Sequence, residues 1–203
     1  MEVLEGILKS KLKPGRFKHT QGVVQTAAKL AKIHGVNLAQ VRIAAWLHDC
    51  AKALDREEMN SLLSKAKADP QERSMTALWH APVGALLARR DFGVRDGEVL
   101  MAIRFHSTGA PGMGDLQKLI FVADYIEPGR PAWPELKSLR TTAKRDLDEA
   151  YLGVLRYKLI DLLESSRPLH SRSIAAYHFA LRQRPGQPQP FQGVTLTATK
   201  EKG

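Results

Sequence analysis

Apolar residues recur at every third or fourth position along almost all of the 203-residue chain, and the alternating pattern of strands is nearly absent. This spacing places the apolar side chains on one face of a helix. In the first clear example, Val23, Ala27 and Leu30 share a face. That helix extends from Arg16 to a stop at Gly35. Since apolar helix faces must be buried against other elements, the pattern predicts an all-α bundle.

Capping residues mark where further helices begin and end. A long amphipathic helix is expected from Leu147 to Leu163, and Pro128 should stop the helix before it. The residues expected to open helices are Asn37, Asp55, Asp96, Asp115 and Ser171. No segment argues for a second domain. We therefore expect one domain over residues 1–182 and a mobile tail over residues 183–203, which are rich in Pro, Gly and polar residues.

Composition restricts the setting of the protein. Cys50 is the only cysteine, so no disulfide can form within the chain and a cytoplasmic location is expected. No apolar run approaches the ~20 residues that span a bilayer, so we expect no membrane insertion. The net charge of +10 favours a polyanionic partner, which leaves nucleic acid, an acidic membrane surface or a nucleotide polyphosphate open. Most basic side chains, among them Arg156 and Lys158, are expected on solvated helix faces.

Several polar residues lie within helix faces that otherwise face the core. The stretch "AAWLHDCAKAL", for example, contains an adjacent His and Asp. Burying even one neutral polar group without a partner costs roughly 2–7 kcal/mol. The residues of this kind are His19, His48, Asp49, His80, His106 and Asp124.

Taken singly, each of these residues is best explained as a hydrogen-bonded core residue. Their occurrence together favours a shared site, where ligands project inward from several helices of a bundle. A mixed set of imidazoles and carboxylates suits Fe, Mn, Zn or Co better than Ca or Mg. The pattern therefore predicts a central metal site.

The order of these residues resembles a known signature. His19, the doublet His48-Asp49 and the distant Asp124 are similar to the H…HD…D motif of the HD-domain metal-dependent phosphohydrolases. The stretches "RFKH", "LHDCAK", "HAPVGALLA", "HSTGAPGM" and "FVADYIEPGR" resemble, more narrowly, the YqeK-like family of symmetrical bis(nucleosyl)-tetraphosphate hydrolases. The likeness spans roughly residues 14 to 180.

The resemblance implies a metal site and a reaction. Its metal ligands would be His19, His48, Asp49 and Asp124, holding a divalent ion that is iron in the family, with Mn, Co and Zn as alternatives. A second ion would lie near His80 and His106. Water activated by the metal would split diadenosine tetraphosphate into two ADP.

The resemblance also implies residue roles. The catalytic residues would be Asp49, Lys52, His80 and His106. The substrate contacts would be Arg16, His19, Asp49, His80, His106, Ser107, Thr108, Asp124, Arg130, Arg167, His170, Ser171 and Arg172. A homodimer is the assembly expected from the family.

Two other functions are compatible with the residues. Another HD phosphohydrolase could act on nucleoside mono- or triphosphates or on a guanosine alarmone. The shape of the pocket decides among these substrates, and the sequence does not reveal that shape. A helical nucleic-acid-binding protein with vestigial HD residues would also explain the positive charge. The chain has no groove-reading motif and no interleaved aromatic and basic residues for stacking bases, so nucleic acid is the less favoured partner.

Overall fold

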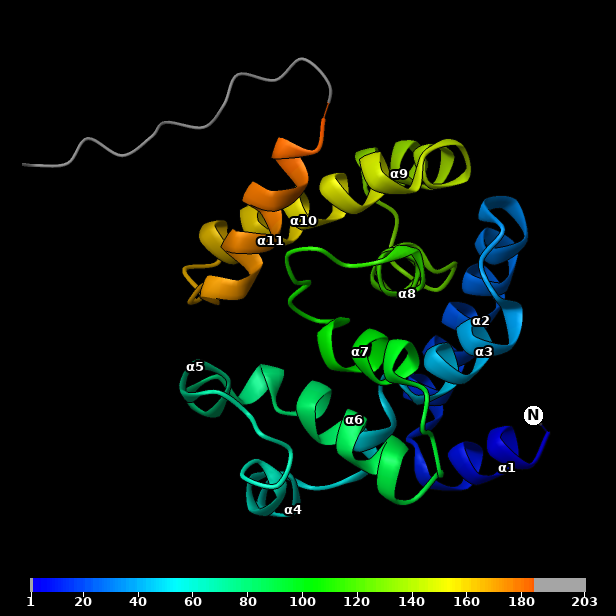
Figure 1. Ribbon diagram of the computed structural model, residues 1–203, viewed down its shortest axis with the longest axis vertical. Coiled ribbons are helices and arrows are strands. Elements are labelled where there is room, and N and C mark those ends of the chain that lie inside the picture. Colours follow the sequence, from blue (N-terminus) through cyan, green and yellow to red (C-terminus); the bar gives the residue numbers. More distant parts are fainter. Residues whose placement is uncertain (1, 185–203) are drawn as a thin grey trace, which may run out of the picture.

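The computed structural model describes residues 2–184, and every regular element within them is helical (Figure 1). The elements, where η denotes a 3-10 helix, are α1 (Glu2–Lys11), α2 (Pro14–His34), α3 (Leu38–Leu47), η1 (Cys50–Ala53), α4 (Arg56–Leu62), α5 (Pro70–Ser74), η2 (Thr76–Leu78), α6 (His80–Arg90), α7 (Gly97–Phe105), α8 (Asp115–Ile126), α9 (Pro134–Arg145), α10 (Leu147–Glu164) and α11 (Ser171–Arg182). The predicted all-α bundle is confirmed.

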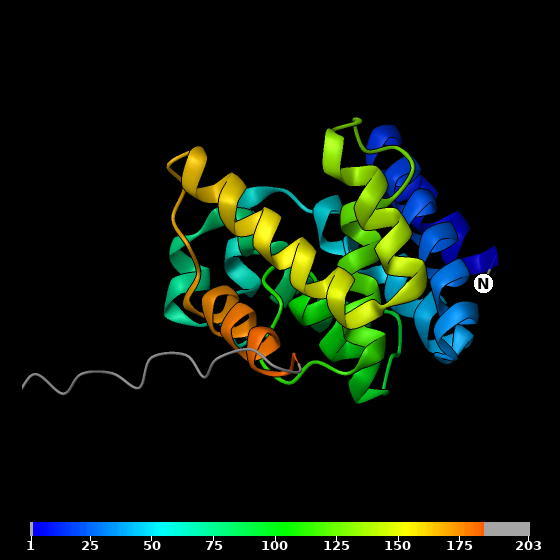
Figure 2. The same cartoon turned by 90° about the horizontal axis from the view of Figure 1, so that it is seen from above.

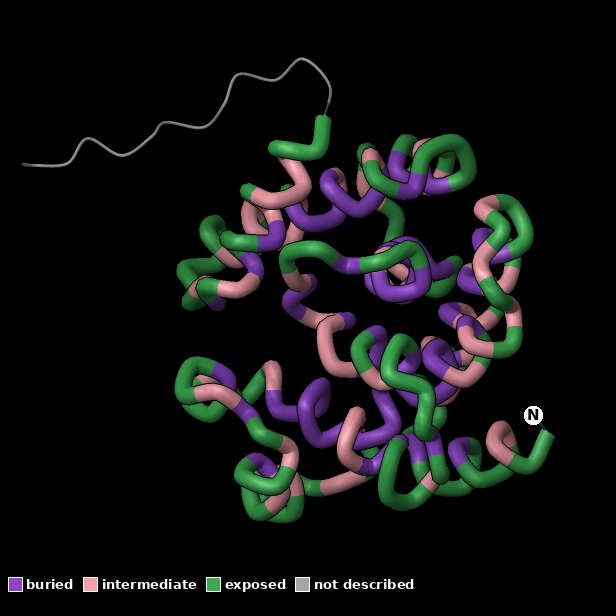
Figure 3. The backbone as a smooth tube through the Cα atoms, in the orientation of Figure 1, coloured by how far each residue is buried: buried purple, intermediate pink, exposed green. Residues whose placement is uncertain are grey.

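Helix α8 lies at the centre of the bundle, where Figure 3 shows it almost wholly buried. Its neighbours are α2, α3, α7 and α10, which pack around it. The sequence "LQKLIFVADYI" explains this position, because apolar residues occupy nearly all sides of the helix rather than one stripe. Phe121, Val122 and Ala123 are fully buried in succession. Asp124 follows this run and its side chain is only 13% exposed, so it faces the interior of the bundle, whereas Asp115 at the start of the helix is exposed.

The remaining helices form two groups around this centre. Helices α4, α5 and α6 lie on one side of α7, whereas α9, α10 and α11 cover the opposite side of α8 (Figure 1). Helix α10 runs diagonally across the molecule and packs against α8, α9 and α11 (Figure 2). The HD doublet lies where α3 ends, next to α6 and α7, so it faces the centre of the bundle.

Most expected caps are present. The Asn37 and Asp96 side chains accept hydrogen bonds from backbone N–H groups at their helix starts, and Asp55 forms a complete capping box with Glu58. Gly35 ends α2 with a φ of 67°, a left-handed conformation that glycine adopts at little cost.

Two expected caps were wrong by one residue. The N-cap of α8 is Gly114, and Asp115 is the first helical residue. The Gln117 side chain reaches back and accepts from the Gly114 N–H, which is half of a capping box. The N-cap of α11 is His170 rather than Ser171, because its imidazole accepts from the Arg172 N–H.

Three α-helices were not predicted. They are α1, which precedes the first predicted helix, the short α5, and α9, which begins directly after Trp133. The signal for α9 was present, because Pro134 opens it and Leu136, Leu139 and Ala143 follow the helical spacing. No helix among the described residues has both the length and the hydropathy to cross a membrane. The tail expected over residues 183–203 lies outside the described residues from 185 onward.

Candidate functional site

The HD doublet reaches the interior because a helix ends at it. Helix α3 stops at Leu47, His48 is its C-cap, and the backbone turns at Asp49 into η1. Adjacent residues of a continuous helix would point about 100° apart. The change of backbone direction instead lets both side chains face the same space. His48 and Asp49 are 0% and 2% exposed, so both are removed from solvent.

A first group of ligand atoms lies between α2, α3 and α8. His19 comes from α2 and Asp124 from α8, and they meet His48 at the end of α3. The Nε2 atom of His19 lies 3.0 Å from Oδ1 of Asp124, and the Nε2 atom of His48 lies 3.9 Å from the same oxygen. One ligand atom from each residue lies within 4.8 Å of the other two, a spacing that suits a shared cation.

A second group lies beside the first and combines Asp49 with two more imidazoles. His80 is the first residue of α6 and His106 is the C-cap of α7. Their Nε2 atoms are 3.1 Å apart, and each lies 3.5 Å from Oδ1 of Asp49. These three residues are all buried and also place ligand atoms within 4.8 Å of one another.

Asp49 lies between the two groups. Its Oδ2 atom faces the first group, 3.6 Å from Nε2 of His48 and 3.9 Å from Nε2 of His19. Its Oδ1 atom faces His80 and His106. A single carboxylate therefore presents one oxygen to each group.

Backbone carbonyls orient two of the imidazoles. Nδ1 of His48 lies 2.7 Å from the Ala45 carbonyl oxygen, and Nδ1 of His106 lies 2.8 Å from that of Ile103. Both histidines follow the last turn of a helix, where carbonyl oxygens lack partners within the helix. A proton on Nδ1 can be donated to that carbonyl, which leaves the Nε2 lone pair directed into the site.

A carboxylate orients the third imidazole. Oε1 of Glu127 lies 3.1 Å from Nδ1 of His19, and Glu127 is only 3% exposed. The Gly129 N–H donates to the other oxygen of Glu127. Such a carboxylate holds a ligating imidazole in one tautomer and makes it more basic. The sequence reading missed Glu127, although a carboxylate directly after the apolar run of α8 was a usable signal.

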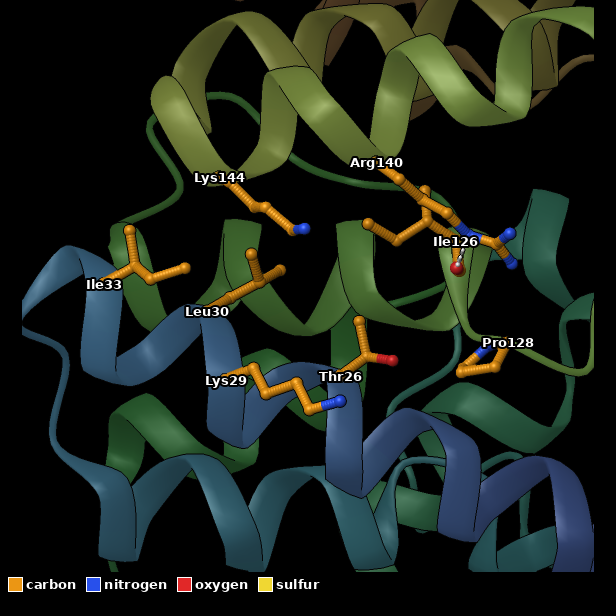
Figure 4. Close-up of a pocket in the computed structure, with 8 residues that line it drawn as sticks. All are labelled: Thr26, Lys29, Leu30, Ile33, Ile126, Pro128, Arg140 and Lys144. Carbon is orange, nitrogen blue, oxygen red and sulfur yellow. Dashed lines mark hydrogen bonds between the residues drawn. The ribbon is translucent and has the colours of Figure 1, made fainter.

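Arg140 of α9 fastens the end of α8 that carries Glu127. Its guanidinium donates to the carbonyl oxygens of Ile126 and Glu127, at 2.8 Å in each case. Figure 4 shows Arg140 reaching across to Ile126 beside Pro128. The last carbonyls of a helix have no partner within it, so this contact satisfies them and holds the segment in place.

The protonation states of His48 and Asp49 suit metal binding. Burial lowers the pKa of His48 to about 4, so its imidazole is neutral at neutral pH. Burial alone would raise the pKa of Asp49, but the neighbouring His48, His106, His80 and Lys52 hold that pKa well below its usual range. Neutral imidazoles and ionised carboxylates are the forms that bind metal ions.

Three buried atoms of the site lack hydrogen-bond partners among the described residues, namely Nε2 of His19, Nε2 of His48 and Oδ1 of Asp49. All three are potential ligand atoms, and leaving them unpaired in the interior is costly. The residues therefore fit a divalent cation, whose coordination would satisfy these atoms.

Three cationic side chains lie at the open side of the site. Nη1 of Arg16 lies 2.8 Å and Nζ of Lys52 3.5 Å from oxygens of Asp49. Nη2 of Arg130 lies 3.1 Å from Oδ1 of Asp124. The three side chains are 36%, 30% and 37% exposed, so an incoming anion can reach them.

Comparison with known proteins agrees with this geometry. A family model described as "HD domain" matches residues 16–129, a span that includes all six polar residues of the two groups. The chain belongs to the HD-domain family. Helices α9 to α11 lie beyond the matched span and complete the bundle around it.

Relatives of this HD-domain protein match it over most of their length. It is 40% identical over 174 residues to the symmetrical bis(5'-nucleosyl)-tetraphosphatase of Halalkalibacterium halodurans, covering 85% of this chain and 92% of the relative. It is 38% identical over 173 residues to the Bacillus subtilis protein of the same name, with the same coverage. The fold is similar, with a TM-score of 0.85 and 33% identity, to a predicted HD superfamily hydrolase involved in NAD metabolism from Clostridium acetobutylicum, covering 90% of this chain and 97% of that one.

Ser107 and Thr108, the two hydroxyl residues after His106, have different surroundings from one another in this HD domain. Oγ of Ser107 lies 2.9 Å from Nε2 of His80 and 3.1 Å from Nε2 of His106, so it is part of the second group. Thr108 is buried, and its hydroxyl donates to the Gly109 carbonyl.

The remaining expected substrate contacts lie at the start of α11 and just before it. Arg172 pairs with Glu72 and Asp69, and Ser171 donates to the side chain of Gln71. The other two residues here also have acidic partners, Asp161 for Arg167 and Asp69 for His170. Among the described residues, the hydrogen bonds and ion pairs of these four side chains join α11 to α5 and α10 rather than to the two His and Asp groups.

A cavity of about 400 Å³ opens beside His19. Its walls come from the first half of α2 and from the segment after α8. The lining residues are Gly15, Lys18, His19, Gln21, Gly22, Gln25, Glu127, Pro128 and Gly129. A ligand bound at the His and Asp centre could extend into this space.

Proposed function

We propose that this HD-domain protein is a metal-dependent hydrolase that cleaves dinucleoside tetraphosphates symmetrically, with diadenosine tetraphosphate yielding two ADP. The observation that carries the proposal is Asp49 placed between two groups of buried ligand atoms, with Arg16 and Lys52 beside it. Two relatives whose names state this activity are matched by this chain over 92% of their own length, which supports the choice of substrate.

The proposed cofactor is a divalent ion held by His19, His48, Asp49 and Asp124, with iron as the native metal. A second ion is proposed at Asp49, His80 and His106, because those ligand atoms are equally close. When bound, such ions supply a nucleophilic water at neutral pH and positive charge for phosphate oxygens.

Asp49 is the proposed central catalytic residue, since its carboxylate is ionised and lies where a water near the ligand atoms could donate to it. Attack by that water on one inner phosphorus breaks the bond to the oxygen that joins the two halves of the tetraphosphate. That oxygen leaves with one nucleoside diphosphate, and the water oxygen stays on the other. His80, His106 and Ser107 lie at the second group, where they would contact the phosphate chain.

Positive charge around the phosphates is required because negative charge spreads over the transferring oxygens in the transition state. Arg16, Lys52 and Arg130 would supply it from the open side of the site. We propose further substrate contacts by Thr108 and, at the α11 edge, by Arg167, His170, Ser171 and Arg172. We also propose that the protein acts in the cytoplasm as a homodimer, which light scattering after size exclusion would test.

The first experiment compares the wild type with His48→Ala. Bound metals are quantified in both proteins, and diadenosine tetraphosphate is followed by chromatography. His34→Ala is the matched control, because His34 lies at the other end of α2 and contacts the Ala143 carbonyl rather than the site.

The proposal predicts two ADP per substrate from the wild type and the control, and loss of both metal and activity in His48→Ala. AMP plus ATP as products would reject symmetric cleavage. A wild type that binds metal but leaves diadenosine tetraphosphate intact would reject this substrate, and other phosphate esters would then be tested. A protein that has neither metal nor turnover but binds RNA would favour the nucleic-acid alternative.

A further inference from the structure

Lys158 lies close to the site, although the sequence predicted it on a solvated face. It belongs to α10, which packs against α8 (Figure 2). Its side chain is partly buried, and Nζ lies 4.5 Å from the ring centroid of Phe121, a fully buried residue of α8. Phe121 precedes the ligand residue Asp124 by three positions, so the two side chains lie near one another on the helix. The expectation was wrong for Lys158 because α10 turns this residue toward α8.

The Lys158 ammonium has no carboxylate at ion-pair distance within residues 2–184, and its identified close contact there is the aromatic face of Phe121. Burial lowers the pKa of Lys158, and the charge of Asp124 partly counteracts this effect. A buried cation normally has a direct anionic partner, because desolvation of an unpaired charge is costly. Lys158 therefore has unused capacity to bind an anion.

The other charges near Lys158 indicate where that anion would lie. Arg130 and Lys52 are close enough to lower the pKa of Lys158 further by repulsion. These two already contact carboxylates of the metal site, Asp124 and Asp49 respectively. Three cations from three different segments thus lie within electrostatic range of one another, two of them in direct contact with Asp124 and Asp49. Mutual repulsion of this kind is relieved when an anion with several oxygens binds between the cations.

We propose that the Lys158 ammonium binds a non-bridging phosphate oxygen of the polyphosphate substrate. The phosphate chain would then be held between Lys158 on α10 and Lys52 on η1. The choice of a polyphosphate rests on the proposed function, whereas the anion site itself rests on the contacts of Lys158. The Phe121 ring attracts the ammonium through its face but accepts no conventional hydrogen bond, so the N–H groups of Lys158 can still donate to a phosphate oxygen.

The test measures binding rather than turnover. ADP and inorganic pyrophosphate are titrated calorimetrically into the metal-loaded full-length protein, as wild type, Lys158→Met, Lys158→Gln and Lys158→Arg. Arg156→Met is the matched control, because Arg156 lies two residues away on the same helix and is exposed. Metal content and melting temperature are recorded for each protein, so that a loss of folding or of metal is recognised.

We expect both neutral variants to bind ADP and pyrophosphate about 10- to 100-fold more weakly, the effect of removing one charged hydrogen bond. Lys158→Arg should retain most of the affinity, and Arg156→Met all of it. Neutral variants with full metal content and wild-type affinity would overturn the inference, as would a wild type that binds neither anion. A wild type that binds ADP through Lys158 but leaves diadenosine tetraphosphate intact would reject the proposed function and retain the anion site.

Discussion

At the scale of single residues, the site depends on groups that orient ligands as much as on the ligands. His48 and His106 use carbonyls of their own helices, which is a local arrangement. His19 instead uses Glu127, a residue 108 positions away. Glu127 is in turn held by the Gly129 N–H and, through its carbonyl, by Arg140. The position of one imidazole therefore depends on the correct packing of α2, α8 and α9.

Replacing Glu127 tests this dependence. We expect Glu127→Ala to weaken metal binding about 10- to 100-fold, the usual effect of removing a partner that orients a ligating imidazole. Glu127→Gln should retain more affinity, because its amide oxygen can still accept from Nδ1 of His19. Competition with a coloured chelator measures the affinity directly.

Gly22 offers an independent way to disturb the same carboxylate. A Cβ atom at position 22 would lie 2.4 Å from Oε2 of Glu127, so Gly22→Ala should displace Glu127 and reproduce the loss of metal affinity. Gly15→Ala is the control in the same helix, since a Cβ there meets nothing within 4 Å. Equal metal affinity in the wild type, Glu127→Ala and Gly22→Ala would show that Glu127 does not orient His19.

At the scale of elements, α11 is joined to α5 by a network of charges. Glu72 of α5 is 1% exposed and pairs with Arg104 of α7 and Arg172 of α11. The side chains of Asp69, Glu72 and His170 could in principle hold a metal ion. The arginines already neutralise the two carboxylates, so we interpret this cluster as a link between helices.

Removing the charge of Glu72 should destabilise the fold. Glu72→Gln leaves two largely buried guanidinium groups without a carboxylate, and breaking a buried pair in this way costs about 3–5 kcal/mol. Urea unfolding of both proteins at pH 7 measures the difference. Glu57→Gln, an exposed first-turn residue of α4, is the control and should change stability little.

The effect of Glu72 should depend on pH in a defined direction. Burial alone would raise the pKa of Glu72, but hydrogen bonds from Arg104 and Arg172 lower it below the usual 4.5. The unfolded chain therefore takes up the proton first as the pH falls. The stability due to Glu72 is complete above about pH 5 and is lost at lower pH. A difference between the wild type and Glu72→Gln that persists unchanged at pH 3 would contradict this explanation.

At the scale of the whole molecule, the metal centre joins helices that are far apart in sequence. The proposed ligands come from α2, the α3–η1 turn, α6, α7 and α8, so a bound ion would link most of the bundle. Helices α9 to α11 lie outside this set and depend on packing against α8 and on the charge network of α5.

Removing the metal should therefore lower thermal stability. An ion present at a thousand times its Kd stabilises the folded state by about 4 kcal/mol. For a domain of this size that corresponds to roughly 8–16 °C in Tm. Scanning calorimetry of chelated and metal-loaded protein measures the shift. His48→Ala should show no response to added metal, and a shift of equal size in that variant would place the stabilising ion elsewhere.

The sequence by itself determined the helices and the chemistry of the ligands. Both are local properties, because helical spacing, caps and residue type are read within a few positions, as at Gly35 and Asp55. The resemblance of the HD motif to a known family added the order of the ligands. Helix α9 was not predicted, although Pro134 and the helical spacing of the apolar residues after it indicate a helix in the sequence. That omission was an error of interpretation.

Only the tertiary structure decided how those residues meet. Asp49 faces two groups because α3 ends beside it, Glu127 orients an imidazole from another helix, and the Lys158 ammonium packs on Phe121 of α8. Each depends on the packing of segments that are dozens of residues or more apart. The spacing of residues within one helix carries no information about that packing, since it defines the face that is buried but not the helix that covers it.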